Sequence, residues 1–89
     1  HVGDGNFHFG YLIDPDSEAE RRTAEDLNHK LVARALALEG TCTGEHGVGL
    51  HKMGFLLDEA GEGAVQMMRT IKRALDPDNI MNPGKIFSL

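Results

Sequence analysis

The chain has 89 residues and a formal net charge of −5, so we expect one domain with a modest core. Its basic residues are scattered, which argues against a nucleic-acid surface, because such surfaces gather Lys and Arg on one face. No apolar run approaches the roughly 20 residues of a membrane-spanning helix. The single Cys42 has no partner for an internal disulfide, which is compatible with a reducing compartment.

The N-terminal part of the sequence predicts a turn and then a strand. His1 stands where an open reading frame would begin with Met, so we expect a piece of a longer chain. Residues 6–13, "NFHFGYLI", are rich in aromatic and β-branched side chains and predict a strand that leaves the turn Gly-Asp-Gly-Asn. Pro15, between two Asp residues, predicts a turn that ends this strand.

The next segment predicts a helix over residues 17–39. Ser17 and Glu20 have the spacing of a capping box at its start. Gly40 stands where a helix C′ glycine belongs. Apolar residues recur at three- and four-residue steps, which is typical of a helix with one buried face: Ala24, Leu27, Leu31, Ala35 and Leu38.

The second half of the chain predicts another helix and an apolar tail. Residues 41–43 suit a short strand, and residues 50–61 suit a short helix followed by a break. Residues 62–75 predict the second helix, which Asp76-Pro77 ends because the residue before a proline disfavours the α region. The tail that follows is extended and apolar, so we expect it to pack on something, in this piece or in the rest of a longer chain.

Two glycine-rich segments carry the residues best suited to chemistry. His1 and His8 flank the first turn, and Glu45 and His46 lie in "TGEHGVG". Two imidazoles and one carboxylate are a usual ligand set for zinc, manganese or iron. The spacing of the two histidines matches no standard zinc motif, so hydrogen bonding to loop backbone remains the alternative. Adjacent side chains on an extended segment point in opposite directions, which would let Glu45 bind a metal while His46 faces a substrate as a general base.

Three segments together resemble a known family. "HVGDGNFH" (1–8), "GTCTGEHGVG" (40–49) and "LDPDNIMNPGKIF" (75–87) are similar to the C-terminal part of the FAD-linked oxidases of the vanillyl-alcohol-oxidase superfamily. Within it they most resemble the D-lactate dehydrogenase (cytochrome) and glycolate oxidase flavin-subunit group, with D-2-hydroxyglutarate dehydrogenase a near relative.

The resemblance implies roles for individual residues. The metal-dependent members bind a divalent zinc or manganese ion through residues that match His1, His8 and Glu45. The histidine that matches His46 contacts substrate and accepts the proton of its hydroxyl group. Asn82 and Lys85 of the "NPGK" segment match residues of a tail that returns toward the flavin; without the resemblance, Lys85 is as well explained as a surface charge.

The resemblance also implies a reaction and its partners. The metal lowers the pKa of the hydroxyl group of a small D-2-hydroxy acid, and a hydride passes to FAD. Hydroxyglutarate-type members often carry Asn two residues after the second histidine, where this chain has Gly10, which favours D-lactate or glycolate. The electron acceptor would be a cytochrome, a quinone or an electron-transfer flavoprotein. The enzyme would be cytoplasmic or peripheral to a bacterial inner membrane, or mitochondrial in a eukaryote.

For the fold, the resemblance implies an α+β, ferredoxin-like C-terminal domain. Residues 1–89 would form part of it, with two main helices, one or two short strands and an extended tail, while the FAD-binding domain lies elsewhere. We expect such a piece alone to be inactive and its sheet edge to invite pairing, including with a second copy. Two other classes stay open: a non-redox metalloenzyme with a two-His-one-carboxylate site, and a structural or assembly domain whose site is vestigial.

Overall fold

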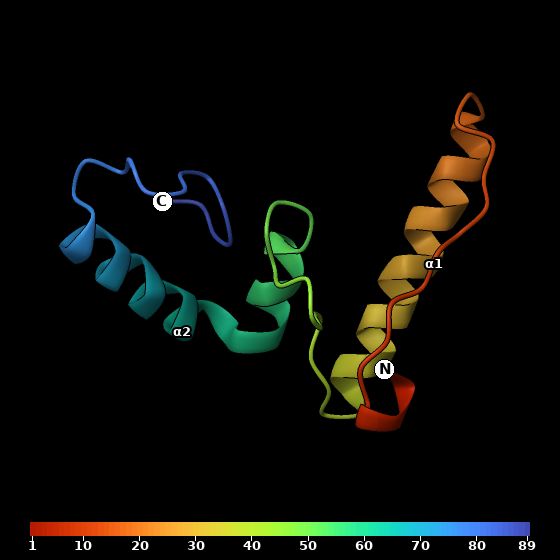
Figure 1. Ribbon diagram of the computed structural model, residues 1–89, viewed down its shortest axis with the longest axis horizontal. Helices are drawn as coiled ribbons and strands as arrows, with labels where there is room; N and C mark the ends of the chain where they lie inside the picture. The colour runs from red at the N-terminus through yellow and green to blue at the C-terminus, as the bar shows by residue number, and fades with distance from the viewer. The chain divides into compact units, whose positions relative to one another are not determined.

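A computed structural model describes residues 1–89. The chain forms two compact units, residues 1–45 and residues 46–89, and each is described by itself. The first unit contains the short 3-10 helix η1 (Val2–Asp4) and the helix α1 (Glu18–Ala37), and the second contains α2 (Met53–Leu75) (Figure 1). None of these helices combines the length and the apolar character needed to cross a membrane.

Local side-chain chemistry fixes the start of α1. The Ser17 hydroxyl accepts a hydrogen bond from the backbone N–H of Glu20 at 3.2 Å, as the capping box predicts. The Glu20 carboxylate takes a different partner from the one expected, because it accepts from the backbone N–H of Asp14. The predicted cap is therefore confirmed, and the acidic side chain ties the preceding turn to the helix.

The end of α1 follows a Schellman pattern. The N–H of Gly40 donates to the carbonyl of Ala35 at 2.8 Å, and the N–H of Glu39 donates to Leu36 at 3.0 Å. The left-handed residue is Glu39, with φ 64°, and not the expected Gly40. Gly40 is required for a different reason, since a Cβ on it would lie 2.9 Å from the Ala35 carbonyl oxygen.

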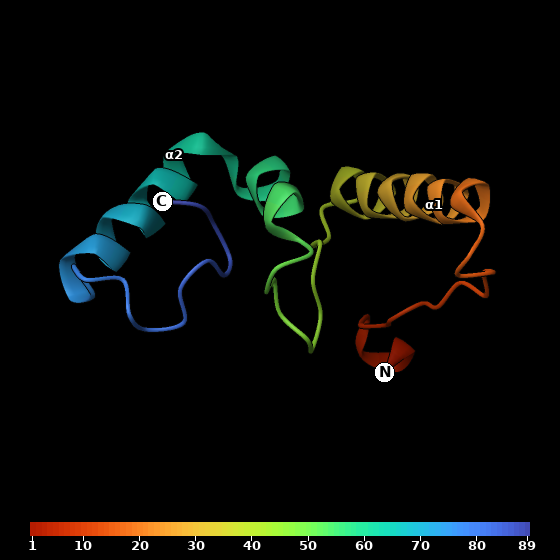
Figure 2. The same ribbon diagram turned by 90° about the horizontal axis from the view of Figure 1, so that it is seen from above.

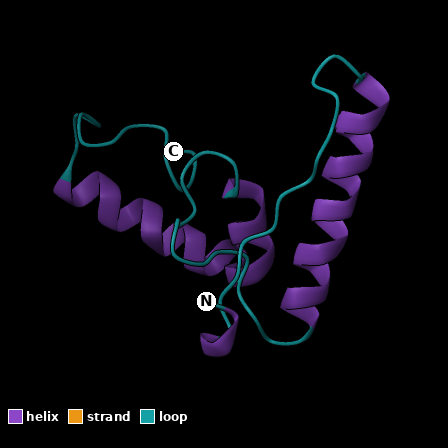
Figure 3. Ribbon diagram, turned by 45° about the vertical axis from the view of Figure 1, so that its right-hand side comes forward, coloured by secondary structure: helices purple, strands orange, loops and turns teal.

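The predicted strands do not form. Residues 6–13 run back along α1 as an extended segment without strand pairing, and residues 41–43 form a bend rather than a strand (Figures 2 and 3). The expectation of one or two strands in a ferredoxin-like sheet is wrong for this structure, which contains helices and loops only. A strand is defined by hydrogen bonds to a neighbour, and the composition of residues 6–13 supplies no such neighbour.

The second helix begins earlier than expected. It extends over Met53–Leu75, with a break at Gly61, whose φ of 83° and ψ of 163° are not helical. The predicted break at residue 61 is therefore confirmed, and the helical segments on either side of it form one bent element. Leu56 and Val65 are its buried residues. The apolar Ile71 and Leu75 of the same helix are exposed.

The C-terminal tail is tied to α2 by hydrogen bonds, but the apolar packing expected of it is not seen at Ile80, Met81 and Leu89, which are 77%, 68% and 50% exposed. It runs back along the helix (Figure 1). Arg69 Nε donates to the Ser88 carbonyl at 2.7 Å, and Arg73 Nη2 donates to the Leu89 carbonyl at 2.9 Å. The N–H of Ile86 also donates to the Gly49 carbonyl at 2.8 Å. The tail is thus held at its end by two arginines of one helix.

Asp76 organises the turn between α2 and the tail. It is only 7% exposed, and its carboxylate accepts hydrogen bonds from the N–H groups of Ile80 at 3.1 Å and Met81 at 2.9 Å. Lys72 Nζ also donates to this carboxylate. These contacts, first the one from Lys72 and then the one from Met81, lower the pKa of Asp76. The Asp76 carboxylate therefore stabilises the turn after α2 through these hydrogen bonds, in addition to standing before a proline at the helix end.

Candidate metal centre

The first segment of the site is a tight turn that fixes His1. The carbonyl of His1 accepts hydrogen bonds from the N–H groups of Asp4 at 2.9 Å and Asn6 at 3.3 Å. Gly5 has φ 74° and ψ 16°, a left-handed conformation that glycine adopts without a steric penalty. The turn reverses the chain, so that the extended segment carrying His8 leaves beside His1.

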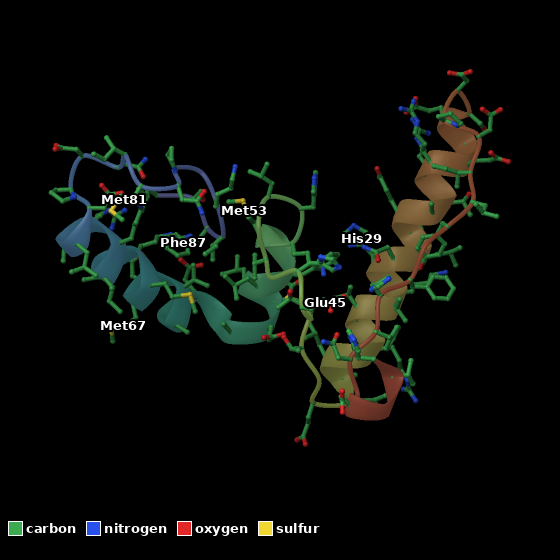
Figure 4. All side chains as sticks on the ribbon, viewed as in Figure 1. His29, Glu45, Met53, Met67, Met81 and Phe87 are labelled. Carbon is green, nitrogen blue, oxygen red and sulfur yellow. The ribbon has the colours of Figure 1, made fainter.

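The second segment is the first part of the loop that follows α1, and it carries Glu45 (Figure 4). Cys42 lies in this loop and is only 7% exposed, so it is a small buried residue of the loop. Gly44 then passes close to the first turn, since a Cβ placed on it would overlap the side chain of Asn6. The absence of a side chain on Gly44, next to Glu45, therefore lets the loop approach the side chain of Asn6 closely.

The two segments bring three charged or ionisable side chains together. Nδ1 of His1 lies 3.3 Å from Oε2 of Glu45, and Nδ1 of His8 lies 3.5 Å from Oε1 of the same carboxylate. The side chains of His1, His8 and Glu45 are 67%, 77% and 40% exposed. One carboxylate thus lies between two imidazoles at a surface that a small molecule can reach.

The donor atoms of this cluster are of kinds that bind a divalent metal ion. The two separations, 3.3 Å and 3.5 Å, end on different oxygens of the Glu45 carboxylate, Oε2 and Oε1. Charge-assisted N–H···O hydrogen bonds are shorter, at about 2.7–2.9 Å. Two imidazole nitrogens and a carboxylate oxygen are also donors that Zn²⁺ and Mn²⁺ accept. The kinds of donor therefore suit a divalent ion, and each imidazole lies beside one oxygen of the Glu45 carboxylate.

The remaining predicted site residues belong to the second unit. His46 is its first residue, directly bonded to Glu45, and it is exposed. Asn82 is exposed and has a left-handed φ of 49°, while Lys85 is half-buried in the tail. The three predicted ligands thus belong to the first unit, where both histidines lie close to Glu45. The predicted base and the two tail residues belong to the second unit.

Sequence reasoning missed the contribution of Asn6. Its half-buried side chain occupies the space beside Gly44. The signal available in the sequence was the pair of glycines, Gly5 and Gly44, one next to Asn6 and the other next to Glu45. Nothing in their spacing says that the two segments meet, so this contact required the structure.

Comparison with protein families gives a match over nearly the whole chain. Residues 1–86 match the family described as "FAD linked oxidases, C-terminal domain". The chain belongs to this family. The FAD linked oxidase relatives with curated names include "D-lactate dehydrogenase [cytochrome], mitochondrial" of Arabidopsis thaliana, 58% identical over 97% of this chain and 15% of that protein.

Two further relatives carry different names within the same family. "D-2-hydroxyglutarate dehydrogenase" of Xanthomonas citri pv. viticola is 42% identical over 98% of this chain and 19% of that protein. "Glycolate oxidase subunit GlcD" of Bacillus subtilis is 39% identical over 99% of this chain and 19% of that protein. The resemblance seen in the three sequence motifs is thereby confirmed. The chain spans less than a fifth of the length of the FAD linked oxidase relatives that it matches.

Proposed function

We propose that this chain supplies the metal-binding part of an FAD-dependent dehydrogenase that oxidises a small D-2-hydroxy acid to the 2-oxo acid. The observation that carries the proposal is the carboxylate of Glu45, which lies 3.3 Å from Nδ1 of His1 and 3.5 Å from Nδ1 of His8. Membership of the FAD linked oxidase family supports the flavin. The names of the relatives supply the substrate class, because lactate, glycolate and 2-hydroxyglutarate are all 2-hydroxy acids.

The three ligands hold and orient one reactant. A Zn²⁺ or Mn²⁺ ion bound by His1, His8 and Glu45 would supply positive charge that lowers the pKa of a substrate hydroxyl group. The imidazoles are neutral ligands and the carboxylate carries one negative charge, so a divalent ion there keeps a net positive charge. That charge would also attract the carboxylate of a 2-hydroxy acid.

His46 is the residue assigned to proton transfer. It directly follows Glu45 in the chain, and its side chain is exposed. Its imidazole accepts the proton of the substrate hydroxyl group as the hydrogen on the α carbon leaves with two electrons. FAD, when bound, accepts that hydride. Oxidation of the hydroxy acid to the oxo acid is thereby balanced by reduction of the flavin and protonation of His46.

Residues other than the metal ligands would contact the flavin. We assign Asn82 and Lys85 of the tail to the flavin side, and we place the main FAD-binding domain outside residues 1–89. Lys85 is half-buried, and the tail around it is anchored through Arg69 and Asp76, so both side chains have an ordered support. The reduced flavin would pass electrons to a cytochrome, a quinone or an electron-transfer flavoprotein.

The site favours a short substrate and allows more than one cellular location. Gly10, two residues after His8, has no atom within 4 Å of the position of a Cβ. It offers no side-chain hydrogen bond to a distal carboxylate, which favours D-lactate or glycolate over 2-hydroxyglutarate. A mitochondrial location in a eukaryote follows the names of the mitochondrial relatives, and a cytoplasmic or membrane-peripheral location fits a bacterium.

The experiment uses the flavoprotein that contains this chain. Anaerobic bleaching of the flavin by D-lactate is recorded before metal removal with a chelator, after it, and after return of Zn²⁺ or Mn²⁺. The proposal predicts bleaching that is lost on removal and restored by metal. Bleaching that is indifferent to metal would contradict the metal role and reduce the three ligands to a structural cluster. A protein without flavin would favour the non-redox metalloenzyme.

A further inference from the structure

Asn6 and Gly44 meet where the two halves of the metal centre come together. If Gly44 carried a Cβ, that atom would overlap Oδ1 of Asn6 and lie 3.1 Å from its Cγ and 3.4 Å from its Nδ2. Asn6 is half-buried although most of its neighbours in the first turn are exposed. The amide of Asn6 therefore fills the space that the missing side chain of Gly44 leaves.

This contact connects all three metal ligands through short lengths of chain. The backbone N–H of Asn6 donates to the carbonyl of His1 at 3.3 Å, so the amide is tied to the first ligand. His8 lies two residues further on, and in an extended segment residues two apart share a face. Gly44 is peptide-bonded to Glu45. A shift of Asn6 against Gly44 thus displaces Glu45 relative to both imidazoles.

We propose that Asn6 is a positioning residue for the metal centre and that Gly44, which has no side chain, leaves the space in which the Asn6 amide packs. The pair sets the register between the first turn and the loop after α1, so that the Glu45 carboxylate stops between His1 and His8. The inference rests on the proposed metal site and extends it. It assigns to two residues that bind no metal the positioning of the Glu45 carboxylate beside His1 and His8.

The nature of Gly44 makes the proposal testable by a small change. Gly44 does not have the positive φ of Gly47 or Gly49, so an alanine there is compatible with the backbone. The expected effect of Gly44→Ala is therefore steric and directed at Asn6. Gly3→Ala is the matched control, because Gly3 lies in the first turn beside His1, also lacks a positive φ, and would place its Cβ in open space.

The measurement is the affinity of the 89-residue chain for Zn²⁺ and Co²⁺, with the visible spectrum of bound Co²⁺ as a reporter of ligand geometry. Gly44→Ala is expected to weaken affinity by about 10-fold or more, the loss typical when groups that orient metal ligands are removed. Gly3→Ala is expected to bind as the wild type does. Asn6→Ala alone and the double variant Asn6→Ala/Gly44→Ala are both expected to bind more weakly than the wild type, because each lacks the amide that sets the register.

A second readout separates this inference from the proposed function. In the metal-free wild-type chain, a nuclear Overhauser effect is expected between the side-chain amide protons of Asn6 and the Hα protons of Gly44. If this signal is present but no ion binds, the metal proposal fails and the packing stands. If the signal is absent, or if Gly44→Ala binds metal as tightly as Gly3→Ala does, the positioning role is wrong. Helical circular dichroism of each variant checks that α1 is intact.

Discussion

Nδ1 of His1 lies 3.3 Å from Oε2 of Glu45, although the whole of α1 separates the two residues in the sequence. The contact depends on two local devices: the left-handed Gly5 that closes the first turn, and the close approach of Gly40 to Ala35 that ends α1. The helix carries the chain away from the turn, and the loop after it returns the carboxylate. Two predicted ligands that are far apart in the sequence thereby lie close together in the structure.

Removal of the carboxylate should abolish tight metal binding. Glu45→Gln preserves the shape of the side chain but loses its charge, and we expect the affinity of the chain for Zn²⁺ to fall by more than about 100-fold, beyond the range for groups that only orient ligands. Titration calorimetry measures this, with the α-amino group acetylated so that it is not itself a ligand. Glu25→Gln, on the exposed surface of α1, is the control. Equal affinities for the two variants would contradict the assignment of Glu45.

The cap of α1 should contribute to the stability of the chain. Ser17→Ala removes the hydroxyl group that accepts from the N–H of Glu20 at 3.2 Å, and we expect the free energy of unfolding to fall by about 1 kcal/mol. Urea denaturation followed by circular dichroism measures the change. Thr23→Ala is the control on the same helix, since the Thr23 hydroxyl bonds only to the Ala19 carbonyl and alanine has the higher helix propensity. A loss for Thr23→Ala as large as that for Ser17→Ala would contradict the capping role.

The sequence predicted the helices better than the strands, and the reason is physical. Ser17, the break at Gly61 and the stop at Asp76 act on their own neighbours within a few residues, so a local pattern is enough to recognise them. The strand expected at residues 6–13 depends on hydrogen bonds to another segment. Its composition is the same whether or not a partner is present, and composition was the only signal used.

The residues of the candidate site, too, were only partly predictable from the sequence. His1, His8 and Glu45 were candidates from their residue types and from the family resemblance, and the structure places Nδ1 of each histidine 3.3–3.5 Å from an oxygen of the Glu45 carboxylate. Asn6 was not recognisable, because its contact with Gly44 joins segments on either side of a helix and leaves no periodic pattern. The role of Asp76 was seen only in part, since a residue before proline predicts a helix end but not a bonded turn.

Acid should weaken the turn that Asp76 holds. Folding lowers the pKa of Asp76 below its usual 3.8, chiefly through the Lys72 hydrogen bond and then that of Met81. A carboxyl group with a lowered pKa stabilises the fold fully above its unfolded pKa, and this stabilisation is lost as the pH falls through the folded pKa. The urea midpoint of the wild type should therefore exceed that of Asp76→Asn at neutral pH, and the difference should shrink as the pH falls below 3.8.

The exposed neighbour of Asp76 provides the control for this pH series. Asp78→Asn changes the same functional group two residues away, at an exposed position, and we expect it to follow the wild type at each pH. A difference between wild type and Asp76→Asn that stays constant down to the lowest pH would contradict the role of the Asp76 charge.

Gly10 should influence the choice of substrate in the flavoprotein that contains this chain. Gly10→Asn adds a hydrogen-bonding group two residues after His8, where a Cβ meets no atom within 4 Å. We expect the ratio of kcat/KM for D-2-hydroxyglutarate to that for D-lactate to rise by about 10-fold, the effect of one hydrogen bond. Gly63→Asn, at an exposed position on α2, is the control. An unchanged ratio would show that Gly10 does not influence the choice between the two substrates.

The most direct test of the metal centre is X-ray absorption spectroscopy at the zinc edge of the zinc-loaded protein. The account predicts two imidazole nitrogens at about 2.0–2.1 Å and a carboxylate oxygen at about 2.0–2.2 Å. One imidazole should disappear from the spectrum in His8→Ala. A wild-type spectrum without imidazole scattering, or one that His8→Ala leaves unchanged, would contradict the assignment of His1, His8 and Glu45 as the ligands.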